Sequence, residues 1–183
     1  MELNDIILGF LDWKPLTGYE LKGFFSALDF LPWSGNNNQI YKALLELEKQ
    51  KYVVKEVILQ ENYPPQKRYS VTQEGRERLY SAVGTDPDAP LVKNDFLLHL
   101  AWADCLAEAD LTRLIDSYQL QVEYELKMCR EKIRRDEIHA GRSERESYIW
   151  DMIAQNRADI LQNELNWLTK LRNGLSGKRG TVK

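Results

Sequence analysis

The apolar residues in the first part of the chain recur at helical spacing in three successive segments. Steps of three and four residues place each set on one face of a helix. The three sets are Leu3, Ile6, Ile7, Phe10 and Leu11; Leu21, Phe24, Phe25 and Leu28; and Ile40, Leu44, Leu45 and Leu47. We therefore expect three amphipathic helices, each burying its apolar face.

Local signals mark where these helices begin and end. Lys14-Pro15 stops the first, because proline cannot continue a helix. Thr17-Gly-Tyr-Glu20 has the T-x-x-E form of a capping box, which predicts the start of the second. Leu31 to Gly35 breaks the second helix, and either Ser34 or Asn36 caps the third.

A short run of β-forming residues follows the third helix. Tyr52 to Leu59 is typical of a strand, Asn62 to Pro65 of a turn, and Lys67 to Val71 of the returning strand of a hairpin. Thr72 then caps a helix over residues 73–83. The breaker from Gly84 to Pro90 is the best candidate for a domain boundary.

The second half is helical by pattern. Residues 91–109 are apolar on more than one face, Asp110 is a cap for a long helix, and Ser143 opens a last helix closed by Gly174. Apolar helix faces of this length need a partner surface to cover them, and the simplest partner is a second copy of the chain. The predicted fold is mainly α with a small β-hairpin wing: a winged helix-turn-helix (1–84), a linker (85–90), an antiparallel helical dimerisation and effector domain (91–174) and a disordered tail (175–183).

Composition narrows the function classes. The net charge is −3 and the sequence pI is about 5.5, which argues against a surface coated with phosphate-binding cations but allows a local basic footprint. No apolar run reaches the roughly 20 residues of a membrane span, and Glu2 and Asp5 stand where a secretory signal would be basic. We expect a cytoplasmic protein without a membrane segment.

Residues that carry chemistry do not form a recognisable constellation. Cys105 and Cys129 lack a C-x-x-C pattern, and His99 and His139 are not spaced to join them around a metal. Buried, reduced thiols are the simpler expectation. There is no nucleophile beside a base and no glycine-rich phosphate loop, so no enzyme, metal or cofactor is expected.

Three helices, a hairpin and a helix form the order of a winged helix-turn-helix, whose third helix reads bases. Asparagine and glutamine pair with adenine edges, while tyrosine, lysine and arginine suit sugar and phosphate. The candidate DNA-binding residues are Asn36, Asn37, Asn38, Gln39, Tyr41 and Lys42 on the third helix, and Lys67 and Arg68 beside the hairpin turn. In the alternative interpretation, the asparagines only cap the helix, and Lys67 and Arg68 lie at a solvent-exposed end of a strand.

These segments also resemble a known family. Ile7-Leu-Gly9, Pro15 to Leu21, Asn38-Gln-Ile-Tyr41, Leu44, Leu47-Glu48, Val53 and Lys67 to Thr72 with Gly75 are similar to the PadR regulators over residues 3–80. The second half is similar to the longer, virulence-activator type. The resemblance implies a homodimer that reads a palindromic operator, usually as a repressor, with release by a small molecule. It places Tyr19 as a packing residue, and Lys42 departs from the proline that many members carry.

Aromatic residues of the second half suggest a binding site for a small aromatic effector. Stacking and a histidine hydrogen bond would hold a flat molecule, although core packing is the simpler explanation of aromatic residues in a helical bundle. The candidates are Phe96, His99, Trp102, Trp150 and Trp167. The acidic balance keeps an alternative function open: a winged-helix protein-interaction module, or an activator that works with a partner regulator.

Overall fold

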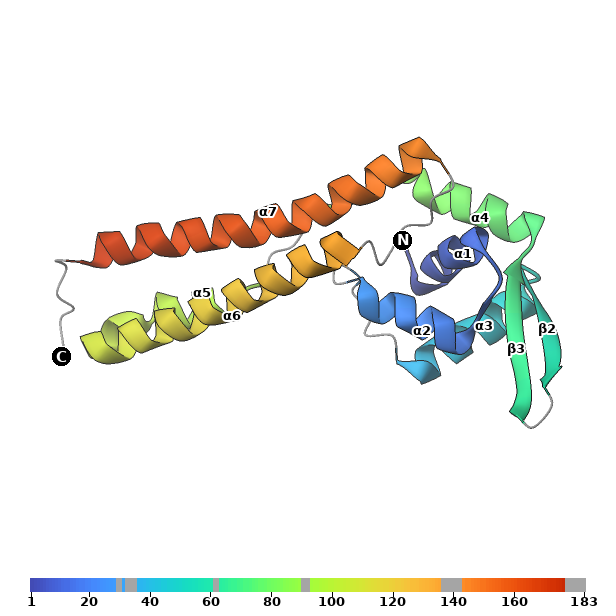
Figure 1. Ribbon diagram of the computed structural model, residues 1–183, viewed down its shortest axis with the longest axis horizontal. Helices are drawn as coiled ribbons and strands as arrows, with labels where there is room; N and C mark the ends of the chain where they lie inside the picture. Colours follow the sequence, from blue (N-terminus) through green and yellow to red (C-terminus); the bar gives the residue numbers. More distant parts are fainter. Residues whose placement is uncertain (29–30, 32–35, 61–62, 90–92, 136–142, 177–183) are drawn as a thin grey trace. The chain divides into compact units, whose positions relative to one another are not determined.

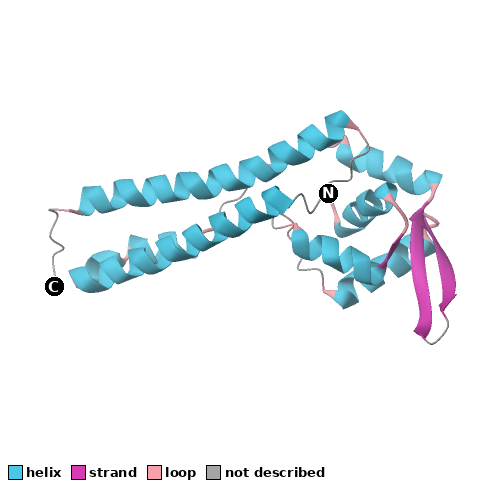
Figure 2. Cartoon of the chain, viewed as in Figure 1, coloured by secondary structure: helices cyan, strands magenta, loops and turns pink. Residues whose placement is uncertain are grey.

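The computed structural model describes residues 1–28, 31, 36–60, 63–89, 93–135 and 143–176. The chain divides into two compact units, Met1–Asp88 and Ala89–Lys183. All strands of the described residues belong to the first unit (Figure 2). Several positions singled out above lie outside the described residues, namely Ser34, Asn62, Leu91, His139 and the tail from 177 on.

The first unit combines four helices with a small sheet (Figure 1). Its elements are α1 (Leu3–Trp13), β1 (Leu16–Thr17), α2 (Gly18–Ala27), α3 (Asn37–Lys49), β2 (Val53–Gln60), β3 (Tyr63–Val71) and α4 (Gln73–Val83). The predicted bounds of the first and fourth helices are confirmed. The mainly helical fold with a winged helix-turn-helix order is confirmed as well.

Three side-chain caps start the later helices of this unit. The Thr17 hydroxyl accepts from the Glu20 amide at 3.2 Å, and the Thr17 amide donates to Glu20 Oε2 at 2.8 Å, which completes the predicted capping box. Asn36 Oδ1 accepts from the Asn38 amide, and the Thr72 hydroxyl accepts from the Gly75 amide. These bonds satisfy amides that have no partner inside the helix.

The core of the first unit collects the predicted apolar faces, with one exception on α3. Ile7, Leu21 and Leu44 are fully buried. Leu45 was expected in the α3 stripe, and this expectation is wrong: its side chain is 62% exposed, and Ala43 is buried instead. Leu45 is five residues from Ile40 and two from Leu47, so a helix of 3.6 residues per turn carries it to the opposite side.

The sheet has three strands in the order β1-β3-β2, one more than the predicted hairpin. β1 pairs with β3 through Leu16 opposite Tyr69 and Thr17 opposite Arg68. β3 begins at Tyr63, so the prediction that Pro64 and Pro65 form the turn is wrong. This part of β3 lies beyond the two-residue partner β1, and prolines are tolerated on such an unpaired strand edge.

Two ion pairs hold α1 against α4. Arg76 Nε lies 2.8 Å from Asp12 Oδ1, and Arg78 Nε lies 3.1 Å from Asp5 Oδ1. Asp5 is only 1% exposed, and its other oxygen accepts from the Glu2 amide at 2.9 Å. A buried carboxylate needs such partners, so these contacts fix the first helix in the unit.

The second unit is a set of helices: α5 (Asp95–Ala101), the 3₁₀ turn η1 (Ala103–Cys105), α6 (Glu108–Arg135) and α7 (Glu144–Leu175). The single helix expected over 91–109 is therefore wrong, since Leu106 is extended and interrupts it. Asp110 lies in the first turn of α6 and is not its cap. Gly174 lies within the last turn of α7, whereas the Ser143 cap is confirmed at 3.1 Å.

The α6 and α7 helices pack through two buried clusters. One cluster is Val122, Leu126, Cys129, Ala158 and Leu161, and the other is Phe96, Ile115 and Leu168. Cys129 is buried as expected, but Cys105 is exposed, because the 3₁₀ turn carries it out of the helix predicted there. Many apolar side chains of this unit are exposed in the single chain, among them Leu98, Trp102, Leu120, Tyr124 and Ile160.

Candidate nucleic-acid interface

The N-terminal turn of α3 presents four polar residues to solvent. Asn36, Asn37, Asn38 and Gln39 are all exposed. The side-chain oxygen of Asn36 is engaged as the helix cap, at 3.0 Å from the Asn38 amide nitrogen. The amides of the following residues extend from a rigid, capped helix end, which is the part of a reading helix that reaches base edges.

The outward face of α3 continues this polar surface. Asn38, Lys42, Leu45 and Lys49 follow at intervals of four, three and four residues, and all four are exposed. They lie opposite the buried stripe of Ile40, Ala43, Leu44 and Leu47. Lys42 and Lys49 give this face two positive charges, which suit phosphate contacts on either side of a groove.

Tyr41 lies at the side of this face, against the start of α2. Its ring occupies the space next to Gly18, where a Cβ would come within 2.7 Å of Tyr41 Cε1. Tyr41 is 45% exposed, so its side chain is only partly covered by this contact. The expectation that Tyr19 packs is wrong, since Tyr19 is 82% exposed and the contact with α3 falls on Gly18 instead.

The two cations of the hairpin lie in the paired part of β3. Lys67 is opposite Val57 and Arg68 is opposite Glu56, whereas pairing continues to Gln60 and Tyr63. Their predicted place beside the turn is therefore wrong, because the hairpin is longer than the sequence suggested. Lys67 is exposed, but Arg68 is half-buried and its Nε makes no hydrogen bond among the described residues.

Arg68 acts on the start of α2. The hydrogen bond from the Thr17 amide, together with the positive charge of Arg68, lowers the pKa of Glu20 below its ordinary value. Glu20 therefore stays ionised as the capping carboxylate. Arg68 thus adds a smaller electrostatic contribution than Thr17 does, and the sequence pattern did not indicate it.

An ion pair joins α3 to the hairpin. Lys55 Nζ of β2 lies 2.7 Å and 3.0 Å from the two carboxylate oxygens of Glu48. The hydrogen bond to Glu48 raises the pKa of Lys55, and burial raises the pKa of the neighbouring Tyr69. Lys55 therefore stays charged, so α3 and β2 are held together by a charged contact.

Comparison with known proteins relates this part of the chain to a protein family. Residues 7–81 match the Transcriptional regulator PadR-like family. The match begins within α1 and ends within α4, so it includes the whole of α3, β2 and β3.

This part of the chain is similar to the PadR-like transcriptional regulators. It is 28% identical over 120 residues to the negative transcriptional regulator PadR of Bacillus subtilis (strain 168). That match spans 65% of this chain and 65% of the relative's length.

Solved structures of PadR-like regulators share the fold. Bacillus subtilis PadR in complex with operator DNA aligns with a TM-score of 0.80 at 22% identity, covering 92% of this chain and 95% of that one. A PadR-like regulator of Bacillus cereus gives 0.65 at 25% identity, with 92% and 96% covered. The Vibrio cholerae virulence activator AphA gives 0.57 at 20% identity, with 96% and 99% covered.

The five candidate effector residues do not form one site. Phe96 is buried, its ring stacking on Tyr118 with centroids 4.0 Å apart and meeting Trp167 edge-on at 6.2 Å. Trp150 lies on α7, 17 residues before Trp167, or about 25 Å along the helix. Phe96 and Trp167 are therefore packing residues of one cluster, and Trp150 is remote from them.

His99 and Trp102 line a different place, an open hollow of about 540 Å³. Its other walls are mainly apolar and include Leu98, Leu106 and Leu114. Trp102 is 72% exposed, and His99 Nε2 lies 3.3 Å from Asp95 Oδ2. An exposed indole beside a histidine suits the face and the polar edge of a flat ring.

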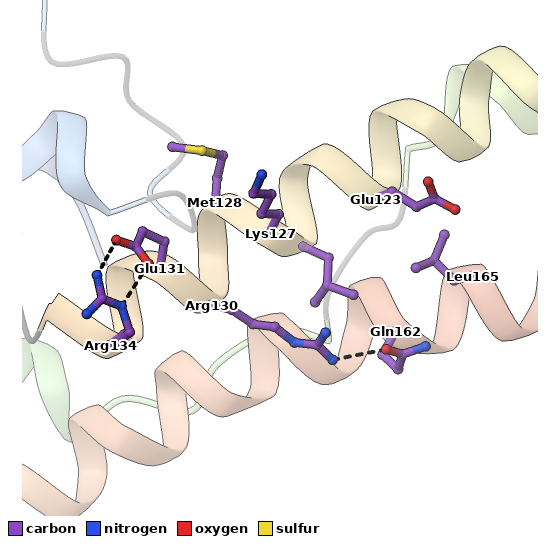
Figure 3. A pocket seen from close by; sticks show the side chains of 9 residues that line it. Glu123, Lys127, Met128, Arg130, Glu131, Arg134, Gln162 and Leu165 are labelled. Carbon is purple, nitrogen blue, oxygen red and sulfur yellow. Dashed lines mark hydrogen bonds and ion pairs between the residues drawn. The ribbon is translucent and has the colours of Figure 1, made fainter.

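A second hollow, of about 550 Å³, lies between α6 and α7 (Figure 3). Arg130 reaches across it to Gln162 Oε1 at 3.1 Å, while Arg134 pairs with Glu131 along α6 at 2.7 Å. Hydrogen bonds from Arg134 and Arg135 lower the pKa of Glu131 to about 2. Arg130 and Arg134 each have a hydrogen-bond partner on α6 or α7, so neither side chain points to a bound ligand.

The part of the chain that the structure describes holds no group of metal ligands. Nowhere in those ranges do three His, Cys, Asp or Glu residues come together as such a site requires. In the same ranges, no helix is both long enough and apolar enough to span a membrane.

Proposed function

We propose that this PadR-like protein binds a palindromic operator as a homodimer and represses the gene beside it. The observation that carries this proposal is the outward face of α3, where exposed amides of Asn38 and Gln39 lead into Tyr41 and Lys42. Amides read adenine edges, and the tyrosine and lysine fit the flanking backbone. The operator complex of Bacillus subtilis PadR supports the same role for this fold.

A binding titration tests the operator proposal. The purified protein is titrated against labelled duplex from upstream of its own gene and against scrambled duplex of the same length. We expect tighter binding to the first duplex and a steep loss of affinity with salt, because each phosphate contact releases counterions. Equal affinity for both duplexes would reject sequence-specific binding.

The proposed dimer uses the second unit. Its helices leave apolar side chains exposed in the single chain, including Leu98 at 61%, Leu120 at 66% and Ile160 at 52%. Exposed patches of this kind mark protein interfaces, and a two-fold axis allows one surface to cover itself. Sedimentation equilibrium should give twice the chain mass at micromolar concentration, and a monomer there would contradict the dimer.

The proposed effector is a small aromatic molecule bound at the hollow of His99 and Trp102. The structure of Bacillus subtilis PadR with p-coumaric acid supports this ligand class. Phe96 and Trp167 act behind the site through packing, and Trp150 has no part in it. Titration with p-coumaric acid should quench Trp102 fluorescence, and Trp102→Leu should abolish that quench.

We also propose a cytoplasmic regulator without catalytic activity, which agrees with the family. The alternative, a protein-interaction module or an activator with a partner regulator, is favoured only by the net charge of −3. The duplex titration separates operator binding from the interaction module, which would bind both duplexes weakly and equally.

A further inference from the structure

One apolar side chain lies in the middle of the outward face of α3. Leu45 is 62% exposed and follows Lys42 by three residues and precedes Lys49 by four. Its position opposite the buried stripe of α3 directs it away from the core of the first unit. Leu45 therefore belongs to the surface that the proposed function turns toward DNA.

The chemistry around Leu45 restricts what can cover it. Two lysines flank it along the helix, and Asn38 continues the same face. A polyanion with a local apolar group fits such a surface better than an apolar protein partner does. In the major groove, the apolar group at the base edges is the 5-methyl of thymine, which aliphatic side chains contact.

We propose that Leu45 is a specificity-determining residue that packs on the methyl group of one thymine in each operator half-site. This inference rests on the proposed operator binding and adds a residue that the periodicity had placed in the core. The lysines on either side would hold the backbone, so that Leu45 lies above the base pairs between them. A Leu45 contact to deoxyribose instead would be independent of sequence.

Replacing thymine by uracil tests the contact, because uracil lacks only the 5-methyl group. The operator is first selected with the wild-type protein from a random duplex library, and each thymine is then exchanged in turn. We expect one thymine per half-site whose exchange weakens wild-type binding about three- to fivefold, the value of one buried methyl group. Leu45→Ala should bind the two probes equally.

A matched control accompanies this variant. Val83→Ala removes an exposed side chain of the same unit, 62% exposed on α4, and should keep the full methyl effect. Leu45→Ala should retain the helical circular dichroism of the wild type, since alanine favours a helix at least as well as leucine.

The outcomes separate this inference from the function beneath it. Wild-type binding that is insensitive to uracil at every position, or a methyl effect that persists in Leu45→Ala, would overturn the role of Leu45 and leave operator binding intact. Failure of the library to enrich any sequence would overturn the proposed function, and the role of Leu45 with it.

Discussion

Gly75 lies so close to the main chain of Tyr52 that a Cβ at Gly75 would overlap the Tyr52 carbonyl oxygen. The same Cβ would come within 2.8 Å of Val71 Cγ2. The Tyr52 carbonyl also accepts from the amide and the hydroxyl of Thr72, at 3.0 and 3.1 Å. These contacts fix the start of α4 to the start of the hairpin, and they leave no room for a Cβ at residue 75.

We predict that Gly75→Ala lowers the free energy of unfolding by about 1–3 kcal/mol, because backbone atoms must move to admit the methyl group. Urea unfolding followed by circular dichroism measures the free energy of unfolding of the variant and of the wild type. Gly23→Ala is the control: a Cβ there meets nothing within 4 Å, so the variant should gain up to about 1 kcal/mol from helix propensity. Equal effects of the two changes would contradict the role of Gly75.

The capping carboxylate of α2 predicts a pH dependence. The pKa of Glu20 is lowered in the folded state from an ordinary value of 4.5, mainly by the Thr17 amide. Its stabilising effect is therefore complete above pH 4.5 and is lost as the pH falls through the lowered folded value. The stability lost in Glu20→Gln should be largest at neutral pH and shrink in acid. A difference that grows toward low pH would refute this assignment.

Sequence reasoning succeeded where structure depends on neighbours along the chain. The caps Thr17 and Thr72 were predictable, and Asn36 was one of two candidates, because a cap binds amides only two or three residues away. The helical order of the first unit followed from these signals. Each of them needs no knowledge of distant residues.

Prediction failed where distant segments decide the outcome. β1 has two residues, too few for a pattern, and exists because β3 pairs with it. The α5 segment was expected to be buried on several sides, but Leu98 and Trp102 are exposed in the single chain. The aromatic residues were grouped by type alone, whereas Phe96 and Trp150 lie in different parts of the second unit.

The Glu48–Lys55 pair predicts a coupling between the reading helix and the wing. Glu48→Lys or Lys55→Glu alone places like charges in contact and should weaken operator binding several-fold. The double exchange restores the attraction and should recover most of the affinity, giving a favourable coupling between the two positions. Operator titrations of the wild type, the two single variants and the double variant measure this coupling. Purely additive losses would show that the pair does not position α3.

Base reading by Gln39 predicts a loss that depends on sequence. Gln39→Ala removes an amide that can pair with adenine, so binding to the operator should weaken by about 1–3 kcal/mol. Binding to random duplex should change much less. Glu46→Ala is a control on the same helix, because a carboxylate makes no favourable phosphate contact. Equal losses by Gln39→Ala on both duplexes would reject base reading.

Lys67 and Arg68 are neighbours in sequence but should respond differently to replacement. Lys67 is exposed, so Lys67→Ala should lower affinity for every duplex and flatten the dependence of log K on log salt by about 0.9 for each phosphate that is no longer neutralised. Arg68 is half-buried near Glu20, so Arg68→Ala should instead raise the pKa of Glu20 toward its ordinary value and reduce stability. Salt titrations and acid unfolding of both variants distinguish the roles. An unchanged salt slope in Lys67→Ala, together with a flattened slope in Arg68→Ala, would reverse the assignment and make Arg68 the residue of the wing that contacts phosphate.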